Sequence, residues 1–239
     1  MTRTTNARIA GVTFLLYIAL GIAGMVLSGK ATGSGGTAEK LASIEQHLTP
    51  YQIGFLLELP TCFAALLLGI TLYAITRDQD ADLAMLALAC RVCEGVLSAV
   101  SVMAPAGILW LEAARGAGGP ANASAEAIGT FLFAMPGWMG LISATFFAVG
   151  STLFAYLLLR GQVIPLVLGW LGIAASLLLV VCLPLQVAGF LHGPFTSFMW
   201  IPMAAFEVPL GLWLLIKGAP LPTHSFGKRA AQMPPLIVE

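Results

Sequence analysis

The sequence predicts an all-α, polytopic integral membrane helix bundle with six transmembrane helices and both termini in the cytoplasm. Hydrophobic residues make up 59% of the 239 residues, and charged residues only 9%. A water-soluble chain carries about 25% charged residues, so this chain has too few of them to cover a globular surface. The mean hydropathy of +0.93 agrees with this. Lipid is therefore the expected solvent for most of the chain.

Six apolar segments are long enough to cross a hydrocarbon core about 30 Å thick, which requires about 20 residues of helix. The six segments lie near residues 9–27, 52–76, 83–106, 128–159, 163–190 and 195–216.

The first three segments are delimited by charged or small residues. The first follows Arg3 and Arg8, and its apolar run is too long for the core of a signal peptide, so we expect it to be a retained span. The link after it, 28–51, is rich in small residues. The second and third segments are joined by a short acidic link at 77–82, which requires them to be antiparallel neighbours.

The fourth segment is too long for a simple crossing, because a helix over 128–159 would reach about 48 Å. Proline removes a backbone hydrogen bond and bends a helix, and Pro136 is followed by Gly137. We therefore predict a break at Pro136, with 128–135 at the interface and 138–159 as the span.

The last two segments complete one membrane domain. The link of Arg160, Gly161 and Gln162 is barely a turn, so the fourth and fifth segments must also be antiparallel. The sixth segment ends at Lys217. We expect residues 1–218 to form a single six-helix transmembrane domain, because the links 28–51 and 107–127 contain little to build a second one. Residues 219–239 are expected to form a polar, proline-containing cytoplasmic tail.

The positions of Lys and Arg predict the orientation, because positive residues outside the spans favour the cytoplasmic side. With the N-terminus inside, seven such residues are cytoplasmic and three are outside. The seven are Arg3, Arg8, Arg77, Arg160, Lys217, Lys228 and Arg229, and the three are Lys30, Lys40 and Arg115. Trp and Tyr residues near both ends of the spans fit the aromatic belts of a membrane protein.

Three stretches resemble bacterial membrane proteins grouped as domain of unknown function 4386. They are Arg8–Gly11 leading into Leu15-Leu16-Tyr17, Leu159–Gly172, and Phe206–Gly218 with its Glu-to-Lys-Gly ending; family members also commonly carry an Arg-x-x-Glu like that of Arg91 and Glu94. The resemblance extends to about Gly218. It implies a six-helix protein of the cytoplasmic (inner) membrane, and it brings no activity, cofactor or catalytic residue to transfer.

Neither a cofactor nor a metal is expected. Cys90 and Cys93 form a CxxC, but on a membrane helix with no second Cys or His pair beside them they are better interpreted as packing residues. Nucleic acid is excluded as a partner, because the formal net charge is zero and the basic residues are scattered singly. The bilayer is the expected partner. A homo-oligomer stays open, since small pairs such as Ala19 with Ala23, or Gly169 with Gly172, permit close helix contact within or between chains.

Four ionisable residues lie inside predicted spans and form the candidate ligand-binding site: Glu58, Arg91, Glu94 and Glu207. A charge at bilayer depth costs about 2.5–3.5 kcal/mol on insertion scales, so such residues usually face a bundle interior and pair there. Arg91 and Glu94 are three residues apart and share a helix face. If all four face a common interior, three acids oppose one base.

Three compensations for the excess negative charge lead to different functions. One or two glutamates stay protonated in a structural polar core, in a protein that acts as a sensor or partner subunit. Alternatively, the cluster binds or transports a cation, an amine or a proton-coupled small solute, with Glu94 and Glu207 near the midplane and Glu58 toward the outer side. Thirdly, the carboxylates serve an intramembrane enzyme acting on a lipid. No matched nucleophile, metal set or histidine in the spans supports an enzyme, and we name no catalytic residue.

Overall fold

The computed structural model describes residues 1–116 and 122–219, and the predicted tail lies outside them from residue 220 onward. The described residues form nine α-helices and no strand, which confirms the predicted all-α class. The helices are α1 (Arg3–Thr32), α2 (Thr37–Gln46), α3 (Leu48–Thr76), α4 (Ala81–Ser101), α5 (Met103–Gly116), α6 (Asn122–Arg160), α7 (Leu166–Val187), α8 (Phe195–Phe198) and α9 (Ile201–Lys217).

Six helical stretches in the described part of the chain are long and apolar enough to cross a membrane, so the six predicted spans are confirmed. The third span combines α4 and α5, and the sixth combines α8 and α9. The helices extend beyond several of the predicted ends. The link 28–51 contains α2, and the link that begins at 107 is helical as far as Gly116.

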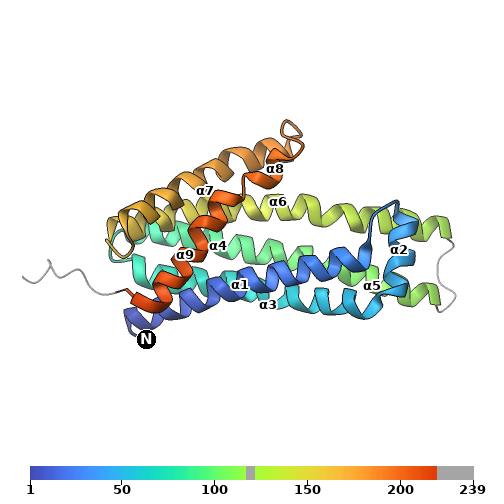
Figure 1. Ribbon diagram of the computed structural model, residues 1–239, viewed down its shortest axis with the longest axis horizontal. Helices are drawn as coiled ribbons and strands as arrows, with labels where there is room; N and C mark the ends of the chain where they lie inside the picture. The colour runs from blue at the N-terminus through green and yellow to red at the C-terminus, as the bar shows by residue number, and fades with distance from the viewer. Residues whose placement is uncertain (117–121, 220–239) are drawn as a thin grey trace, which may run out of the picture.

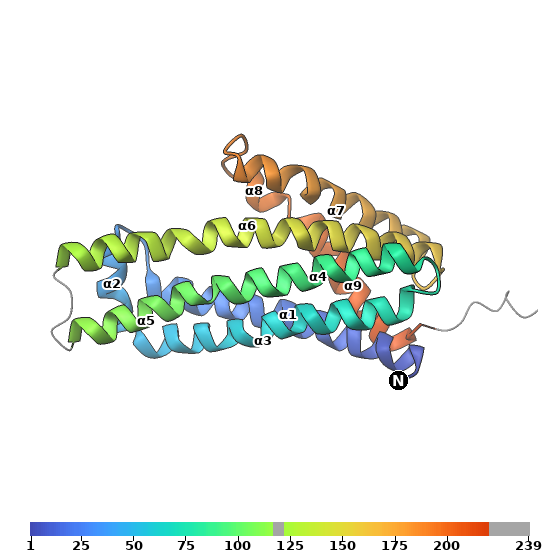
Figure 2. The ribbon, with the colours of Figure 1, turned by 180° about the vertical axis from the view of Figure 1, so that it is seen from behind.

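The predicted break at Pro136 is wrong, because α6 runs through it as one helix of 39 residues. A proline removes one helical hydrogen bond, here the one to the carbonyl of Leu132, and membrane helices absorb that loss when neighbouring helices hold both sides in line. In this protein α6 packs against α4, α5 and α7, and Figure 2 shows α5 alongside the first part of α6 and α4 alongside the later part.

The six spans form a closed ring in which each span packs against the next in sequence. The order around the ring is α1, α3, α4, α6, α7 and α9, and α9 packs back against α1. Short turns join α3 to α4 and α6 to α7. Asp80 caps α4 by accepting a hydrogen bond from the Leu83 amide at 3.1 Å, and Gln162 takes a positive φ of 52° in the turn between α6 and α7.

Two close contacts hold α9 in the ring. A Cβ atom on Gly11 of α1 would lie 2.6 Å from the Gly211 carbonyl oxygen of α9, so only glycine permits the two backbones to approach this closely. The indole Nε1 of Trp213 donates a hydrogen bond to the Val163 carbonyl at 3.0 Å, which ties α9 to the turn between α6 and α7.

The start of α1 and the end of α9 lie at the same end of the bundle, which we call the N-terminal end; the opposite end is the α2 end (Figure 1). At the N-terminal end all six spans are close together. Toward the α2 end, α7 and α8 splay away from the other helices, while α1, α3, α5 and α6 continue (Figures 1 and 2). Two ion pairs lie at the N-terminal end: Arg3 with Asp78 at 3.1 Å and Arg160 with Asp80 at 3.6 Å.

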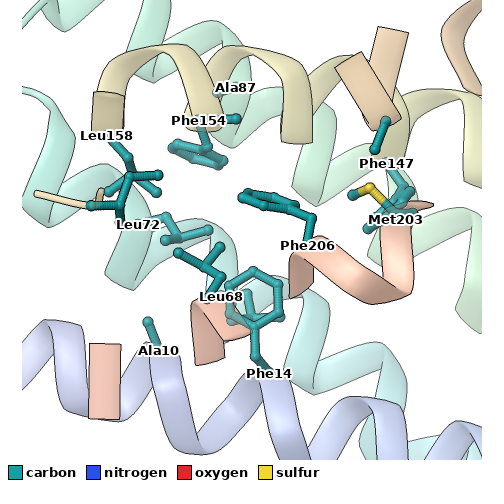
Figure 3. Packing of buried hydrophobic residues seen from close by; sticks show 14 of the residues in the cluster. Ala10, Phe14, Leu68, Leu72, Ala87, Phe147, Phe154, Leu158, Met203 and Phe206 are labelled. Carbon is teal, nitrogen blue, oxygen red and sulfur yellow. The ribbon is translucent and has the colours of Figure 1, made fainter. Parts of the chain in front are cut away.

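The buried apolar residues form two clusters at different heights. The larger fills the N-terminal half and joins all six spans; Figure 3 shows the Phe206 ring of α9 among side chains from its neighbours, with Phe14, Leu68 and Phe154 around it. The smaller cluster lies at the α2 end and includes Ile44, Tyr51 and Leu111. Arg91, Glu94 and Glu207 are buried but belong to neither apolar cluster, and we call these three residues the polar layer.

Candidate functional site

Arg91 and Glu94 form a buried ion pair on α4, as their spacing predicts. The Arg91 Nη1 atom lies 2.9 Å from Glu94 Oε2, and the two side chains are 1% and 2% exposed. The contact is a close ion pair rather than an aligned hydrogen bond, because Glu94 Oε2 has no hydrogen-bond partner. The guanidinium also lies 5.1 Å from the centre of the Phe147 ring, within the range of a cation–π interaction.

Two glycines make room for Arg91. A Cβ atom on Gly69 of α3 would lie 2.9 Å from Arg91 Cβ, and one on Gly150 of α6 would lie 3.5 Å from Arg91 Cδ. The absence of side chains at these positions lets α3 and α6 close around the stem of the arginine. The sequence therefore provides the space for a buried arginine on two neighbouring helices.

Tyr17 of α1 and Ser143 of α6 hold Glu94 from opposite sides. The Tyr17 hydroxyl donates a hydrogen bond to Glu94 Oε1 at 3.3 Å, and the Ser143 hydroxyl donates to the Glu94 backbone carbonyl at 3.0 Å. Since the Ser143 proton is used in this way, Ser98, at 3.0 Å, is the donor in its contact with Ser143. Glu94 is thus the residue to which α1, α4 and α6 all contribute contacts.

The sequence analysis missed Tyr17, Ser98 and Ser143. A usable signal was present for two of them. Ser98 and Ser101 follow Glu94 by four and seven residues, so the three lie on one face of a helix. Tyr17 lies in the middle of its span rather than at an end, where a membrane belt would place it.

Glu207 of α9 is buried and lacks a partner. The residue is 7% exposed, and its Oε1 atom has no hydrogen-bond partner. No ion pair involving Glu207 occurs within residues 1–116 and 122–219. Arg91 Nε and Nη2 are also without partners. An unpaired carboxylate in a low-dielectric interior is costly, so this atom requires a compensating group.

Glu58 of α3 is half-buried, and its carboxylate takes part in none of the hydrogen bonds or ion pairs found in the described part of the chain. Its backbone carbonyl accepts hydrogen bonds from Thr61 Oγ1 at 2.6 Å and from Cys62 Sγ at 3.5 Å. These contacts join the backbone before Pro60 to the side chains just after it, and they do not involve the Glu58 carboxylate.

One cavity of about 310 Å³ brings the three glutamates together. Residues from α1, α3, α4, α6 and α9 line it, with hydroxyl groups and three aromatic rings beside the acids. The lining residues are Tyr17, Glu58, Thr61, Cys62, Glu94, Ser98, Ser101, Val102, Gly140, Ser143, Ala144, Phe147, Trp200 and Glu207. Arg91 is not among the residues that line this central cavity, although its partner Glu94 is.

The central cavity is closed toward the N-terminal end. On that side the larger apolar cluster fills the bundle, and a void of about 10 Å³ lies beside Arg91, lined by Phe14, Leu72 and Phe206 among others. Toward the α2 end a second cavity of about 220 Å³ adjoins it, and Glu58 and Ser101 belong to the walls of both. No group of three or more His, Cys, Asp or Glu residues that could hold a metal occurs in the described parts of the chain.

The comparison with protein families agrees with the resemblance seen in the sequence. The model of a family described as domain of unknown function (DUF4386) matches residues 9–218, which is nearly all of the described chain. No curated protein and no solved structure matches the chain.

Proposed function

Since the chain belongs to the DUF4386 family and crosses the membrane six times, we propose that it binds a small organic cation, such as a protonated amine, in the central cavity and carries it across the bilayer. The observation that supports this most directly is the Glu207 carboxylate. It lines the cavity, and its buried Oε1 atom has no protein partner.

The charge balance of the cavity favours a cationic ligand. Arg91 neutralises Glu94, which leaves Glu58 and Glu207 facing the same space without a basic partner. In a region of low dielectric constant, two uncompensated carboxylates are stabilised by protons or by a bound cation. A protonated amine supplies both a positive charge and N–H donors for Glu207 Oε1.

The remaining walls suit an organic cation better than a bare metal ion. The Phe147 and Trp200 rings lie on one side of the cavity, with ring centres 6.3 Å apart. Aromatic faces attract ammonium groups and pack against hydrocarbon, whereas a metal ion requires several oxygen ligands around it. The hydroxyl groups of Ser98 and Ser101 add hydrogen-bond acceptors on α4.

Carriage across the bilayer is supported by the asymmetry of the cavity. The larger apolar cluster closes the N-terminal end, and the two adjoining cavities extend toward the α2 end. A carrier exposes one site to the two sides in turn, so we assign this arrangement to the state that is closed at the N-terminal end. The predicted orientation makes that end cytoplasmic, in the inner membrane of a bacterial cell.

Native mass spectrometry tests the binding. The protein is released from mild detergent with and without added butylamine, as wild type, Glu207→Gln and Glu45→Gln. Glu45 is exposed on α2 and serves as the matched control. We expect a defined amine adduct, or a co-purified small cation, in the wild type and in Glu45→Gln but not in Glu207→Gln.

Identical bare spectra for all three proteins would contradict the proposal and favour a structural polar core. A Glu207-dependent adduct without uptake of butylamine into proteoliposomes would indicate a sensor or subunit. Turnover of a lipid by the wild type in the absence of any gradient would indicate an intramembrane enzyme.

A further inference from the structure

The walls of the central cavity include residues that are also exposed on the outside of the bundle. Gly140 of α6 and Trp200, just before α9, line the cavity and are both exposed. Pro136, one turn before Gly140, is exposed and lines the second cavity. The two cavities therefore reach the surface along one side of α6.

This side of α6 faces α1 across a window. α1 packs against α3 and α9, and α6 packs against α4 and α7. α1 and α6 do not pack closely against each other in the described part of the chain, and Figures 1 and 2 show α9 near one end of these helices and α2 near the other. A Cβ atom on Gly21 of α1, or on Gly140 of α6, would meet no heavy atom within 4 Å. The central cavity is lined by Tyr17 on α1 and by Gly140 on α6, and we call its mouth between these two residues the α1–α6 window.

The window lies at the edge of the hydrocarbon core rather than in open water. Twenty residues of helix separate Gly140 from Arg160 at the N-terminal end, which is about 30 Å and equals the thickness of the core. Nineteen residues separate Glu58 from Arg77, about 28 Å. Glu58 and the window are therefore at the level where the head groups of the leaflet at the α2 end meet its acyl chains.

Glu207 and Glu94 lie deeper. Ten residues, about 15 Å, separate Glu207 from Lys217, and 13 residues, about 20 Å, separate Glu94 from Ala81. A positive group that enters at the window meets Glu58 first and the deeper carboxylates afterwards. An apolar tail attached to it passes Gly140 and Trp200 and remains among the lipid chains.

We propose that the cavity is loaded sideways from the bilayer through the α1–α6 window, and that its ligand is a cationic amphiphile whose head reaches the three glutamates. The ligand class rests on the proposed function. The route does not, because it follows from the shape of the bundle.

The thiol of Cys62 reports on the route, because it lines the central cavity one turn beyond Glu58. The protein is placed in nanodiscs with Cys62 as its single cysteine, and its reaction with N-dodecylmaleimide is followed. A second protein keeps only Cys93, which is half-buried and lines neither cavity, and reports the reagent concentration in the bilayer.

Gly140→Trp and Gly137→Trp form a matched pair. Both glycines are exposed on α6 with no atom within 4 Å of the added Cβ, but only Gly140 lines the cavity. We expect Gly140→Trp to slow the labelling of Cys62 at least tenfold relative to Cys93, and Gly137→Trp to leave the ratio unchanged. Gly21→Trp, at an exposed position of α1 one turn after the cavity-lining Tyr17, provides a second block with the same expected result.

Labelling of Cys62 that is unaffected by Gly140→Trp and Gly21→Trp but slowed by Leu132→Trp would overturn the window and place the entrance at the α2 end. Leu132 lines only the second cavity, and Phe131→Trp, on its exposed neighbour, is the control.

Protection of Cys62 tests the ligand class. We expect dodecyltrimethylammonium to slow the labelling of Cys62 at least tenfold, and tetramethylammonium at the same aqueous concentration to have little effect. Equal protection by both would overturn the amphiphile while leaving the binding of an organic cation intact. Protection by neither would overturn both the ligand class and the proposed function, and the tryptophan variants would still decide the route.

Discussion

The buried Arg91 side chain has more hydrogen-bond donors than its surroundings use. One nitrogen faces Glu94, and Nε and Nη2 have no partner. Glu207 Oε1, in the same polar layer, also lacks a partner. The polar layer therefore has unused hydrogen-bond donors on α4 and an unused hydrogen-bond acceptor on α9. A cation bound at Glu207, or a proton on its carboxylate, changes this balance.

At the residue scale we predict that Arg91→Ala destabilises the protein strongly. Removing one partner of a buried ion pair leaves the other charge uncompensated and costs about 3–5 kcal/mol. The free energy of unfolding is measured in detergent by denaturant titration. Arg160→Ala is the control, since Arg160 pairs with Asp80 at 3.6 Å and both side chains of this pair are well exposed, at 48% and 33%. Its loss should cost at most about 1 kcal/mol.

The double variant Arg91→Ala with Glu94→Gln should regain part of the lost stability, because it removes the stranded carboxylate. Equal stabilities of wild type and Arg91→Ala would show that the pair is not structural.

Tyr17→Phe tests the hydrogen bond between α1 and α4. The variant removes the donor to Glu94 Oε1, and hydrogen bonds to charged groups are worth about 1.5–3 kcal/mol. We expect a lower midpoint of thermal unfolding in detergent. Tyr73→Phe should unfold like the wild type, because the Tyr73 ring, which contacts Arg77 from 6.0 Å, is retained. A Tyr17→Phe protein as stable as Tyr73→Phe would contradict a stabilising hydrogen bond between Tyr17 and Glu94.

At the scale of the elements, the sequence was informative about the helices and less so about their ends. Apolar length alone predicted all six spans, because the bilayer thickness sets that length. It did not predict that α6 continues through Pro136, because the support comes from α4, α5 and α7 rather than from the proline's own sequence neighbours.

The small residues also show that the sequence alone does not reveal which helices pack together. Gly169 and Gly172 pack within the chain, next to Leu159 and Phe206 respectively, whereas Ala19 and Ala23 are exposed on α1. Their spacing in the sequence is similar, and only the packing of the ring distinguishes an internal contact from a surface. The candidate site follows this pattern: the charges were identifiable one by one, but their shared cavity depends on helices that are distant in sequence.

The crossing of α1 and α9 gives an element-scale prediction. Gly11→Ala places a methyl group against the backbone of α9, 2.6 Å from Gly211 O and Leu215 N, so the helices must separate. Overpacking of this kind costs about 1–3 kcal/mol. Gly21→Ala, on the same helix with open space around it, should be neutral or slightly stabilising. Thermal unfolding of the two variants in one detergent makes the comparison; a Gly11→Ala protein that melts with Gly21→Ala would contradict the close crossing.

At the scale of the whole molecule, the basic residues are unevenly divided between the two ends. Arg3, Arg77, Arg160 and Lys217 lie at the N-terminal end, where Asp78 and Asp80 pair with two of them. Lys30, Lys40 and Arg115 are toward the α2 end. The N-terminal end of the bundle therefore carries more Lys and Arg residues than the α2 end, and such a bias favours one orientation in the membrane.

Fusions of alkaline phosphatase measure that orientation. The enzyme is active only outside the cytoplasm, so we expect high activity for a fusion after Gly35, between α1 and α2, and background activity for one after Gly161, between α6 and α7. The reverse pattern would invert the molecule and exchange the sides assigned to the cavity and to the closed end.

The order of the ring also has a consequence for how the chain is made. Neighbouring spans pack in the order in which the ribosome releases them, and only the contact of α9 with α1 joins the last span to the first. Tyr17, Arg91, Glu94 and Ser143 belong to the first four spans, so all the partners in these contacts are present once the fourth span has been made. Glu207 arrives with the final span. Completion of synthesis is thus the step that adds the unpaired carboxylate, after both partners of the buried ion pair are already in the chain.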